Sequence, residues 1–210
     1  MLLWINGPFG GGKTQTAHEI LRRLPGSVVC DPEHAGFGLR RMLPPALRGD
    51  FQDLVSWRQG VVEVLDLALT RHDGVVIVPM TVTDSGYFAE TVGRLRELGH
   101  DVRHFTLLAE AETVRRRLRE RGLNHLLSYA AGKRPGPRGE SWAEQRLDHC
   151  LARLREPEFA EHLWTDCTTV PRTADRIAVL AGLTLRPNHE GPLRTRLRQA
   201  GVGVRHIRFD

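Results

Sequence analysis

Lysine is nearly absent from this sequence: Lys13 and Lys133 are the only two, so 28 of its 30 basic residues are arginine. Cysteine is also scarce, and three widely spaced cysteines without a Cys-x-x-Cys pair support neither a disulfide framework nor a zinc site. No apolar run approaches the roughly 20 residues that cross a membrane. The apolar run at residues 2–5 is too short for a secretory signal. We therefore expect a cytoplasmic protein.

The composition is that of a globular protein, with 40% apolar and 26% charged residues in a chain of 210. This length suits one sizeable core rather than two ordinary domains. The net charge of +5 fits an anionic small molecule, a nucleic acid or an anionic membrane surface as partner. An arginine bias set by genome composition is an alternative reading that the sequence leaves open.

Short apolar runs alternate with segments of helical periodicity. The runs predict five buried strands at residues 2–5, 28–30, 75–78, 105–108 and 162–164. The periodic segments predict helices at residues 17–24, 54–68, 88–98, 110–121, 141–154 and 173–182. This alternation predicts a three-layer α/β fold with a parallel five-stranded sheet, in which ligands bind at the carboxyl ends of the strands.

A glycine-rich segment follows the first predicted strand. Residues 7–14 match the pattern G-x-x-x-x-G-K-[ST] of the phosphate loop (P-loop, Walker A). Glycines let the backbone N–H groups converge on phosphate, and the next helix presents its N-terminus to the same anion. Lys13 then meets the β- and γ-phosphates, and the Thr14 hydroxyl binds Mg²⁺. We expect ATP, with GTP left open, to contact Gly7, Pro8, Phe9, Gly10, Gly11, Gly12, Lys13, Thr14 and Gln15.

Acidic residues follow the second predicted strand rather than the third. The third strand runs into Pro79-Met80-Thr81, which argues against a motor-type or GTPase-type site. Asp31 and Glu33 flank Pro32 at the end of the second strand, which we expect to lie near the first. One of these acids could accept a proton from an attacking hydroxyl and the other could order a magnesium-bound water. The alternative is that Asp31-Pro32 is only a turn.

Five arginines cluster where the fourth crossover helix meets a segment rich in glycine and proline at residues 122–140. Mobile arginines can neutralise the charge of a migrating phosphoryl group and exclude water. We expect a mobile lid at residues 115–140, with Arg116, Arg117 and Arg121 as its catalytic candidates. A solvated basic helix face is the alternative.

Residues 32–60 are expected to form an acceptor-binding insert. Gln52, Asp53, Trp57 and Arg58 combine hydrogen-bonding groups, an aromatic ring and a guanidinium, a set that can bind a polar ring compound. The alternative is a helix cap by Asp50 or Asp53, with Trp57 in the core.

The chain resembles the tunicamycin-resistance ATP-binding proteins. The resemblance rests on the opening at residues 4–16, on Asp31-Pro32-Glu33 with Gly36, on residues 50–53 with Trp57-Arg58, and on residues 79–81. It covers residues 1 to about 125 best. It implies a fold akin to small-molecule and nucleoside-monophosphate kinases. It also implies protection against a uridine-containing antibiotic through phosphorylation.

These observations define the competing functions. The leading hypothesis is an ATP-dependent kinase acting on tunicamycin or a similar uridine-containing small molecule, and a nucleoside or nucleotide kinase is its near alternative. A protein that binds ATP and sequesters the antibiotic without turnover is the second class. A basic nucleic-acid or membrane-surface protein is the third. We assign residues 1–183 to one domain and 184–210 to a basic extension that could contact a membrane surface, and we do not expect a nucleic-acid partner.

Overall fold

A parallel five-stranded sheet forms the centre of the protein. The computed structural model describes the backbone of residues 1–130 and 139–189, and the side chains of residues 1–120 and 146–189. The strands are β1 (Leu2–Asn6), β2 (Val28–Val29), β3 (Val76–Pro79), β4 (Val102–Leu108) and β5 (His162–Trp164). Their order is β2-β3-β1-β4-β5, and all four neighbouring pairs are parallel. The predicted sheet is thereby confirmed.

The central strand β1 supplies side chains to both faces of the sheet. Its five residues are all buried, because β3 and β4 flank it and helices cover it on both sides. Leu2 and Trp4 join the core on one face, whereas Leu3 and Ile5 join the core on the other. A continuous apolar run is the pattern of a strand buried on both faces.

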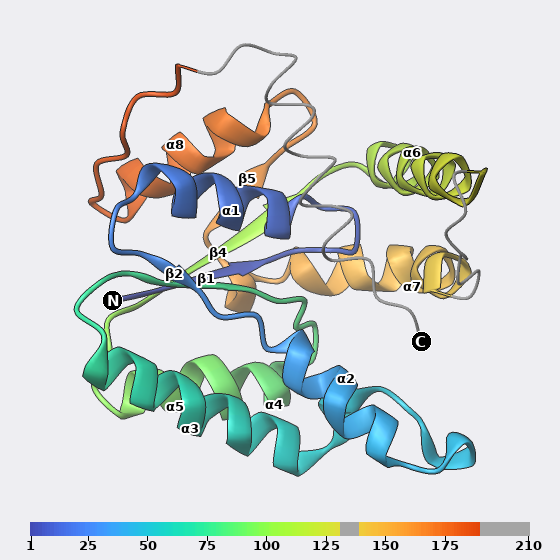
Figure 1. The fold of residues 1–210 in the computed structure, drawn as a ribbon, viewed down its shortest axis with the longest axis horizontal. Helices are drawn as coiled ribbons and strands as arrows, with labels where there is room; N and C mark the ends of the chain where they lie inside the picture. Colours follow the sequence, from blue (N-terminus) through green and yellow to red (C-terminus); the bar gives the residue numbers. More distant parts are fainter. Residues whose placement is uncertain (131–138, 190–210) are drawn as a thin grey trace.

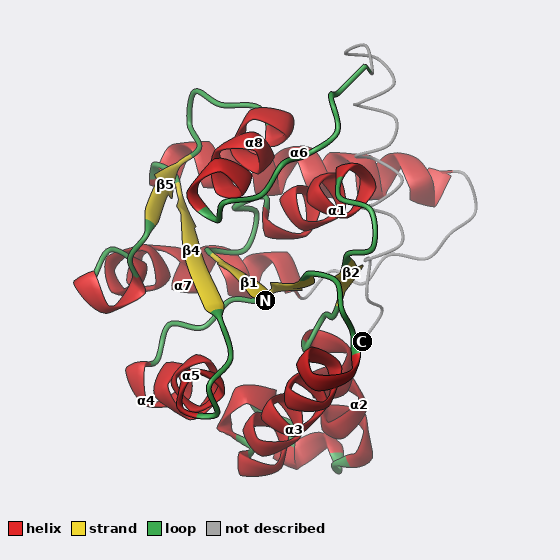
Figure 2. Ribbon diagram, turned by 90° about the vertical axis from the view of Figure 1, so that its left-hand side faces the viewer, coloured by secondary structure: helices red, strands yellow, loops and turns green. Residues whose placement is uncertain are grey.

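Helices cover the two faces of the sheet (Figures 1 and 2). Helices α1 (Lys13–Arg23) and α8 (Val170–Leu180) pack together on one face, where Ile20 and Ile177 fill the core. The other face carries α3 (Val55–Arg71), a helix built from α4 (Ser85–Phe88), η3 (Ala89–Gly93) and α5 (Arg94–Glu97), and α7 (Gly139–Leu154). Helix α6 (Ala111–Ala130) packs on α7.

Two segments are more helical than their sequence indicates. Residues 32–53 show no clear period, and the structure has there helix α2 (Glu33–Met42) and two short 3₁₀ helices, η1 (Pro45–Leu47) and η2 (Phe51–Asp53). The expectation of a mobile loop is wrong for residues 122–130, which continue α6. The rest of the expected lid loop, residues 131–138, lies outside the described residues.

The segment after α8 returns to helix α1. The Arg186 N–H donates to the Arg23 carbonyl at 2.8 Å, and Arg23 Nε donates to the Arg186 carbonyl at 2.7 Å. Residues 190–210 of the predicted basic extension lie outside the described part of the chain. Among the described residues, no helix is both long and apolar enough to cross a bilayer.

Candidate functional site

The phosphate-loop motif connects β1 to α1 at the carboxyl edge of the sheet. Gly7, Gly10 and Gly12 all have positive φ, at 147°, 75° and 93°. The Gly11 N–H donates to the Pro8 carbonyl at 2.9 Å, which closes the turn. Helix α1 begins directly after Gly12, with no acidic residue in its first turn and no side-chain cap among the described residues. Its N-terminus is therefore suited to an anion.

Gly7 is required by close packing as well as by its backbone angle. A Cβ atom on Gly7 would lie 2.7 Å from the Leu107 carbonyl oxygen of β4. Any larger residue would therefore displace the start of the loop from the sheet. The loop fits a phosphate chain because its backbone can turn without side chains filling the concave side.

Lys13 is buried and bends back over the loop. Its Nζ donates to the Pro8 carbonyl at 3.0 Å and lies 5.6 Å from the centroid of the Phe9 ring. Phe9 in turn packs against the apolar cluster that joins α6 to α7. The cation thus lies at the centre of the loop, where it can meet a phosphate, and Phe9 connects the loop to α6 and α7.

Cys150 of α7 lies near this lysine. Burial raises the pKa of the Cys150 thiol to about 11, while the positive charge of Lys13 acts in the opposite direction. The thiol is therefore neutral at physiological pH and serves as a small apolar group beside the loop.

The segment after β3 holds the start of the phosphate loop through two side chains that we did not predict as site residues. The Asn6 amide bonds to the Gly7 N–H and to both backbone groups of Val82, and the Thr81 hydroxyl donates to the Gly7 carbonyl. Asn6 and Thr81 belong to segments that carry the family resemblance, but no local pattern indicates that they meet, since 74 to 76 residues separate the bonded partners.

The acid pair follows β2, as predicted, but β2 is not a neighbour of β1. Strand β3 lies between them, although all three strands end at the same edge of the sheet. One Asp31 oxygen, Oδ1, accepts the Glu33 N–H at 3.0 Å at the start of α2. Asp31 therefore takes part in a turn, and a role for the pair in catalysis stays a prediction.

Trp57 is in the core, which is the alternative left open by the sequence. Its side chain is 1% exposed, and its ring lies 5.3 Å from that of Phe51. The indole Nε1 donates to the Pro32 carbonyl at 3.0 Å. In this conformation the ring cannot stack on a ligand. Instead, Trp57 anchors the segment that carries Asp31 and Glu33 to helix α3.

Arg58 and Asp53 also bond within the protein. The Arg58 guanidinium donates to Glu90 at 2.6 Å and to the Gln52 carbonyl, and it lies 4.3 Å from the Tyr87 ring centroid. The Tyr87 hydroxyl donates to Asp53 Oδ1 at 2.9 Å, and the bond to this carboxylate raises the pKa of Tyr87. These contacts join the insert to α4 and η3.

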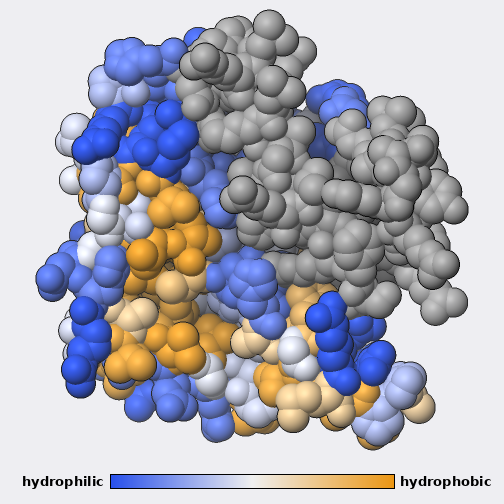
Figure 3. Space-filling view, in the orientation of Figure 1, coloured by the Kyte–Doolittle hydropathy of each residue, from blue (hydrophilic) through white to orange (hydrophobic). Residues whose placement is uncertain are grey.

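Asp50, not Asp53, caps the helical turn η2 by accepting the Gln52 N–H at 3.0 Å. Burial raises the pKa of Asp50, and Arg146 of α7 and Arg40 of α2 act against this rise. The two arginines therefore lie near Asp50 from different elements. The far end of the insert is open to solvent, where Met42 is 81% and Leu47 67% exposed. Hydrophobic and hydrophilic residues lie interspersed over the lower part of the surface in Figure 3.

The arginines of α6 divide among several contacts. Arg117 donates to the Thr165 carbonyl at 2.7 Å and to its hydroxyl at 3.1 Å, beside Asp166. Arg116 is exposed, and the side chain of Arg121 lies outside the described residues. Arg117 is therefore attached to the loop after β5 in this conformation. The two solvent-side arginines at positions 115 and 119 form surface ion pairs with Asp148 and Glu112.

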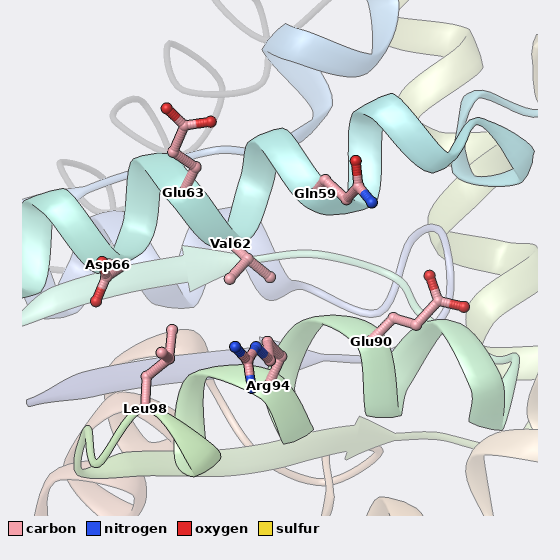
Figure 4. Close-up of a pocket in the computed structure, with 7 residues that line it drawn as sticks. All are labelled: Gln59, Val62, Glu63, Asp66, Glu90, Arg94 and Leu98. Atoms are coloured by element: carbon pink, nitrogen blue, oxygen red, sulfur yellow. The ribbon is translucent and has the colours of Figure 1, made fainter.

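A separate surface groove of about 250 Å³ lies between α3 and the α4–α5 helix (Figure 4). It contains none of the predicted site residues. Three of its charged residues already have partners within the protein: Glu90 pairs with Arg58, Asp66 with His100, and Arg94 with Glu97. We therefore do not assign this groove to the site.

No cluster of three or more His, Cys, Asp or Glu side chains is arranged to hold a metal among the described residues. A magnesium ion would therefore depend on Thr14, on one of the acids after β2 and on the phosphates themselves.

Comparisons with known proteins agree with this geometry. The family model described as "AAA domain" matches residues 2–135. The solved structure of the Deinococcus radiodurans tunicamycin resistance protein is 32% identical, with a TM-score of 0.70, and covers 89% of this chain and 99% of its own. No curated protein sequence matches the chain.

Two kinases share the fold at lower identity. A sugar kinase from Janibacter is 18% identical with a TM-score of 0.56, covering 87% of this chain and 95% of its own. The APS kinase of Mycobacterium tuberculosis, solved with AMPPNP and APS, is 15% identical with a TM-score of 0.56, covering 86% of this chain and 96% of its own. The predicted kinase-like fold is confirmed.

Proposed function

Because the chain belongs to the tunicamycin-resistance family of P-loop proteins, we propose that it binds ATP and transfers a phosphoryl group to tunicamycin or a similar uridine-containing molecule. The observation that supports this most directly is the phosphate loop. It combines glycines of positive φ, an uncapped helix start and a buried lysine at its centre. Bound with Mg²⁺, ATP supplies the activated phosphoryl group.

The residues of the loop bind and orient the phosphates. The N–H groups at the start of α1 point toward the anion, and the Lys13 ammonium exchanges its contact with the Pro8 carbonyl for phosphate oxygens. The Thr14 hydroxyl offers one oxygen for magnesium. Little covalent chemistry is required of the protein, since phosphoryl transfer depends mainly on positioning and charge.

A hydroxyl acceptor has to lose its proton as the new bond forms. We assign to Asp31 the role of accepting this proton. Asp31 follows Cys30, the residue after β2, and the Cys30 N–H bond to the Ile77 carbonyl, 2.9 Å long, holds this part of the backbone to the sheet. Glu33 then orders the magnesium shell or binds the acceptor. The candidates for neutralising the negative charge on the migrating phosphoryl group are still Arg116, Arg117 and Arg121. Arg117 would first have to break its bond to Thr165.

The acceptor is assigned to the insert, residues 32–60, because the insert begins directly after Asp31, contains Glu33 and adjoins the loop edge of the sheet. Gln52 and Asp53 are the candidates for polar contacts with the acceptor. Trp57 and Arg58 instead hold the insert in shape, through their bonds to the Pro32 and Gln52 carbonyls. A protein that binds ATP and sequesters the antibiotic is the alternative, since a tunicamycin resistance protein need not modify tunicamycin.

Mass spectrometry of tunicamycin, uridine and uridine monophosphate after incubation with protein, ATP and Mg²⁺ tests the proposal. We expect a product heavier by one phosphoryl group, and we expect Lys13→Ala to abolish it. Arg71→Ala, which removes an exposed cation at the end of α3, serves as the control and should keep activity. Antibiotic that is bound tightly but recovered unchanged would favour sequestration, and phosphorylated uridine or its monophosphate alone would favour a nucleotide kinase.

A further inference from the structure

The start of the phosphate loop is bonded to a segment far away in sequence, which we call the β3-exit segment (residues 80–84). Asn6, the last residue of β1, is fully buried. Its Oδ1 accepts the Gly7 N–H at 2.8 Å and the Val82 N–H at 3.0 Å, and its Nδ2 donates to the Val82 carbonyl at 2.8 Å. Three of the four hydrogen bonds that an amide side chain can make are thus used on backbone groups.

Thr81 completes the attachment. Its side chain is almost fully buried, and its hydroxyl donates to the Gly7 carbonyl at 2.8 Å. Gly7 therefore has its N–H bonded by one side chain and its carbonyl by another. Leu107 of β4 closes a third side, where even a Cβ atom on Gly7 would clash. Both peptide units that flank Gly7 are therefore held, and the residue has little freedom to turn.

We infer that Asn6 and Thr81 are positioning residues that hold the first turn of the phosphate loop in the shape that binds a nucleotide. This inference rests on the nucleotide-binding function proposed above. A glycine-rich loop has many backbone conformations of similar energy, and ordering it on binding would lower affinity. The buried hydrogen bonds order the loop before the phosphate arrives.

The end of β3 takes part in the same attachment. None of the four residues directly after this strand, 80–83, is an acid, and a hydroxyl and two backbone groups of this segment bond to Gly7 and Asn6 instead. The β3-exit segment is itself supported from α7, where Arg153 Nε donates to the Thr83 carbonyl at 3.3 Å. The loop is thereby fixed to two layers of the fold.

The test compares three threonine variants by calorimetric titration with AMPPNP and Mg²⁺, together with urea unfolding. Thr81→Val keeps the shape of the side chain and removes the hydroxyl, so the Gly7 carbonyl loses its partner, and we expect the Kd to rise about tenfold. Thr81→Ser restores the donor and should recover most of the affinity. Thr91→Val is the control, because its equally buried hydroxyl donates to the Tyr87 carbonyl within the α4–α5 helix rather than to the phosphate loop. It should lower stability without changing the Kd.

Asn6→Asp adds a readout that a loss of stability would not produce. The carboxylate still accepts from Gly7 and Val82, but it repels the Val82 carbonyl and the incoming phosphates. When protonated, it donates to that carbonyl as the amide does. We therefore expect its Kd, relative to wild type, to improve as the pH is lowered from about 8 to about 5.5, since burial raises a carboxyl pKa.

The outcomes separate this inference from the function on which it rests. If the wild-type protein binds no AMPPNP, or Lys13→Ala binds it equally well, the proposed nucleotide function is wrong. If the wild type binds and Thr81→Val binds with the same Kd at a temperature where it is folded, Thr81 does not position the loop. A loss in Thr91→Val equal to that in Thr81→Val would likewise overturn the inference, because the effect would follow stability alone.

Discussion

Arg58 offers the sharpest test of how the insert is held. Its side chain is 7% exposed, and its guanidinium faces three groups of the protein: the Glu90 carboxylate, the Gln52 carbonyl and the Tyr87 ring. Arg58→Met keeps the length and apolar stem of the side chain and removes all three polar contacts. We expect this variant to unfold more easily while its nucleotide affinity stays unchanged.

The size of the loss follows from the contacts. The charge-assisted hydrogen bond to the Gln52 carbonyl contributes about 1.5–3 kcal/mol, because its removal also leaves a partly buried carbonyl without that partner. The cation–π contact with Tyr87 adds roughly 0.5–1 kcal/mol. The ion pair adds at most about 1 kcal/mol, since the Glu90 side chain is 50% exposed and can regain water. We expect a net loss of about 2–5 kcal/mol in the free energy of unfolding.

Urea unfolding of Arg58→Met measures this loss, with Arg94→Met as the control. Arg94 lies on the neighbouring helix and, within the described part of the chain, pairs only with Glu97 at the surface, so its replacement should change stability by about 0.5 kcal/mol or less. A loss below about 1 kcal/mol in Arg58→Met would refute the structural role. Full stability combined with lost acceptor turnover would instead make Arg58 a ligand-binding residue.

Two further predictions concern ionisable groups. Asp31→Asn or Glu33→Gln should lower single-turnover phosphoryl transfer at least about a hundredfold with little change in nucleotide Kd, and wild-type rates in both variants would mean that the pair is only a turn. His104 is buried, and burial lowers its pKa to about 4. Because the unfolded chain then binds the proton more readily, stability should be complete above about pH 6.5 and fall by up to about 3 kcal/mol as the pH drops to 4. His104→Gln should remove this part of the pH dependence in unfolding curves, and an unchanged slope would contradict the assignment.

Features of the fold and the site could be predicted from the sequence where the signal lies in one continuous segment. The phosphate loop is contiguous, and its glycines, lysine and threonine occupy adjacent positions along the chain, so its conformation and place could be predicted together. The five strands were recognisable for the same reason, because each apolar run is continuous. Strand β4 extends three residues further toward its start than predicted, since Arg103 and His104 interrupt the apolar run.

Helix α2 was missed because two glycines, Gly36 and Gly38, lie within its ten residues and weaken the helical pattern. The structure supplies the reason for one of them. A Cβ on Gly36 would lie 2.4 Å from the ring of Phe51, so glycine is needed for α2 to pack on η2. This requirement arises between segments, and no periodicity within α2 indicates it.

The role of Trp57 could not be decided from sequence for a related reason. An aromatic ring followed by an arginine is compatible both with a ligand site and with a packed helix. The choice depends on what faces the ring, and here Phe51 and the Pro32 carbonyl face it. The bonds from Asn6 to Val82 and from Thr81 to Gly7 could not be predicted for the same reason, since each joins residues distant in the chain.

The contacts that hold the phosphate loop and those that hold the insert differ in burial, and this difference indicates which part of the site moves. The phosphate loop is held by Asn6 and Thr81, which are buried, whereas the insert is held partly by Glu90 and Asp53, which are exposed to solvent. Segments with fewer buried contacts open at lower free energy, and water has to be excluded before a phosphoryl group is transferred. We therefore expect closure to be a movement of the insert toward a fixed loop. Hydrogen exchange should be faster in α2 than in β1 and β3 without ligand, and nucleotide with acceptor should slow it in α2 most. Equal protection of α2 and β1 in the free protein would show that the insert is as rigid as the loop.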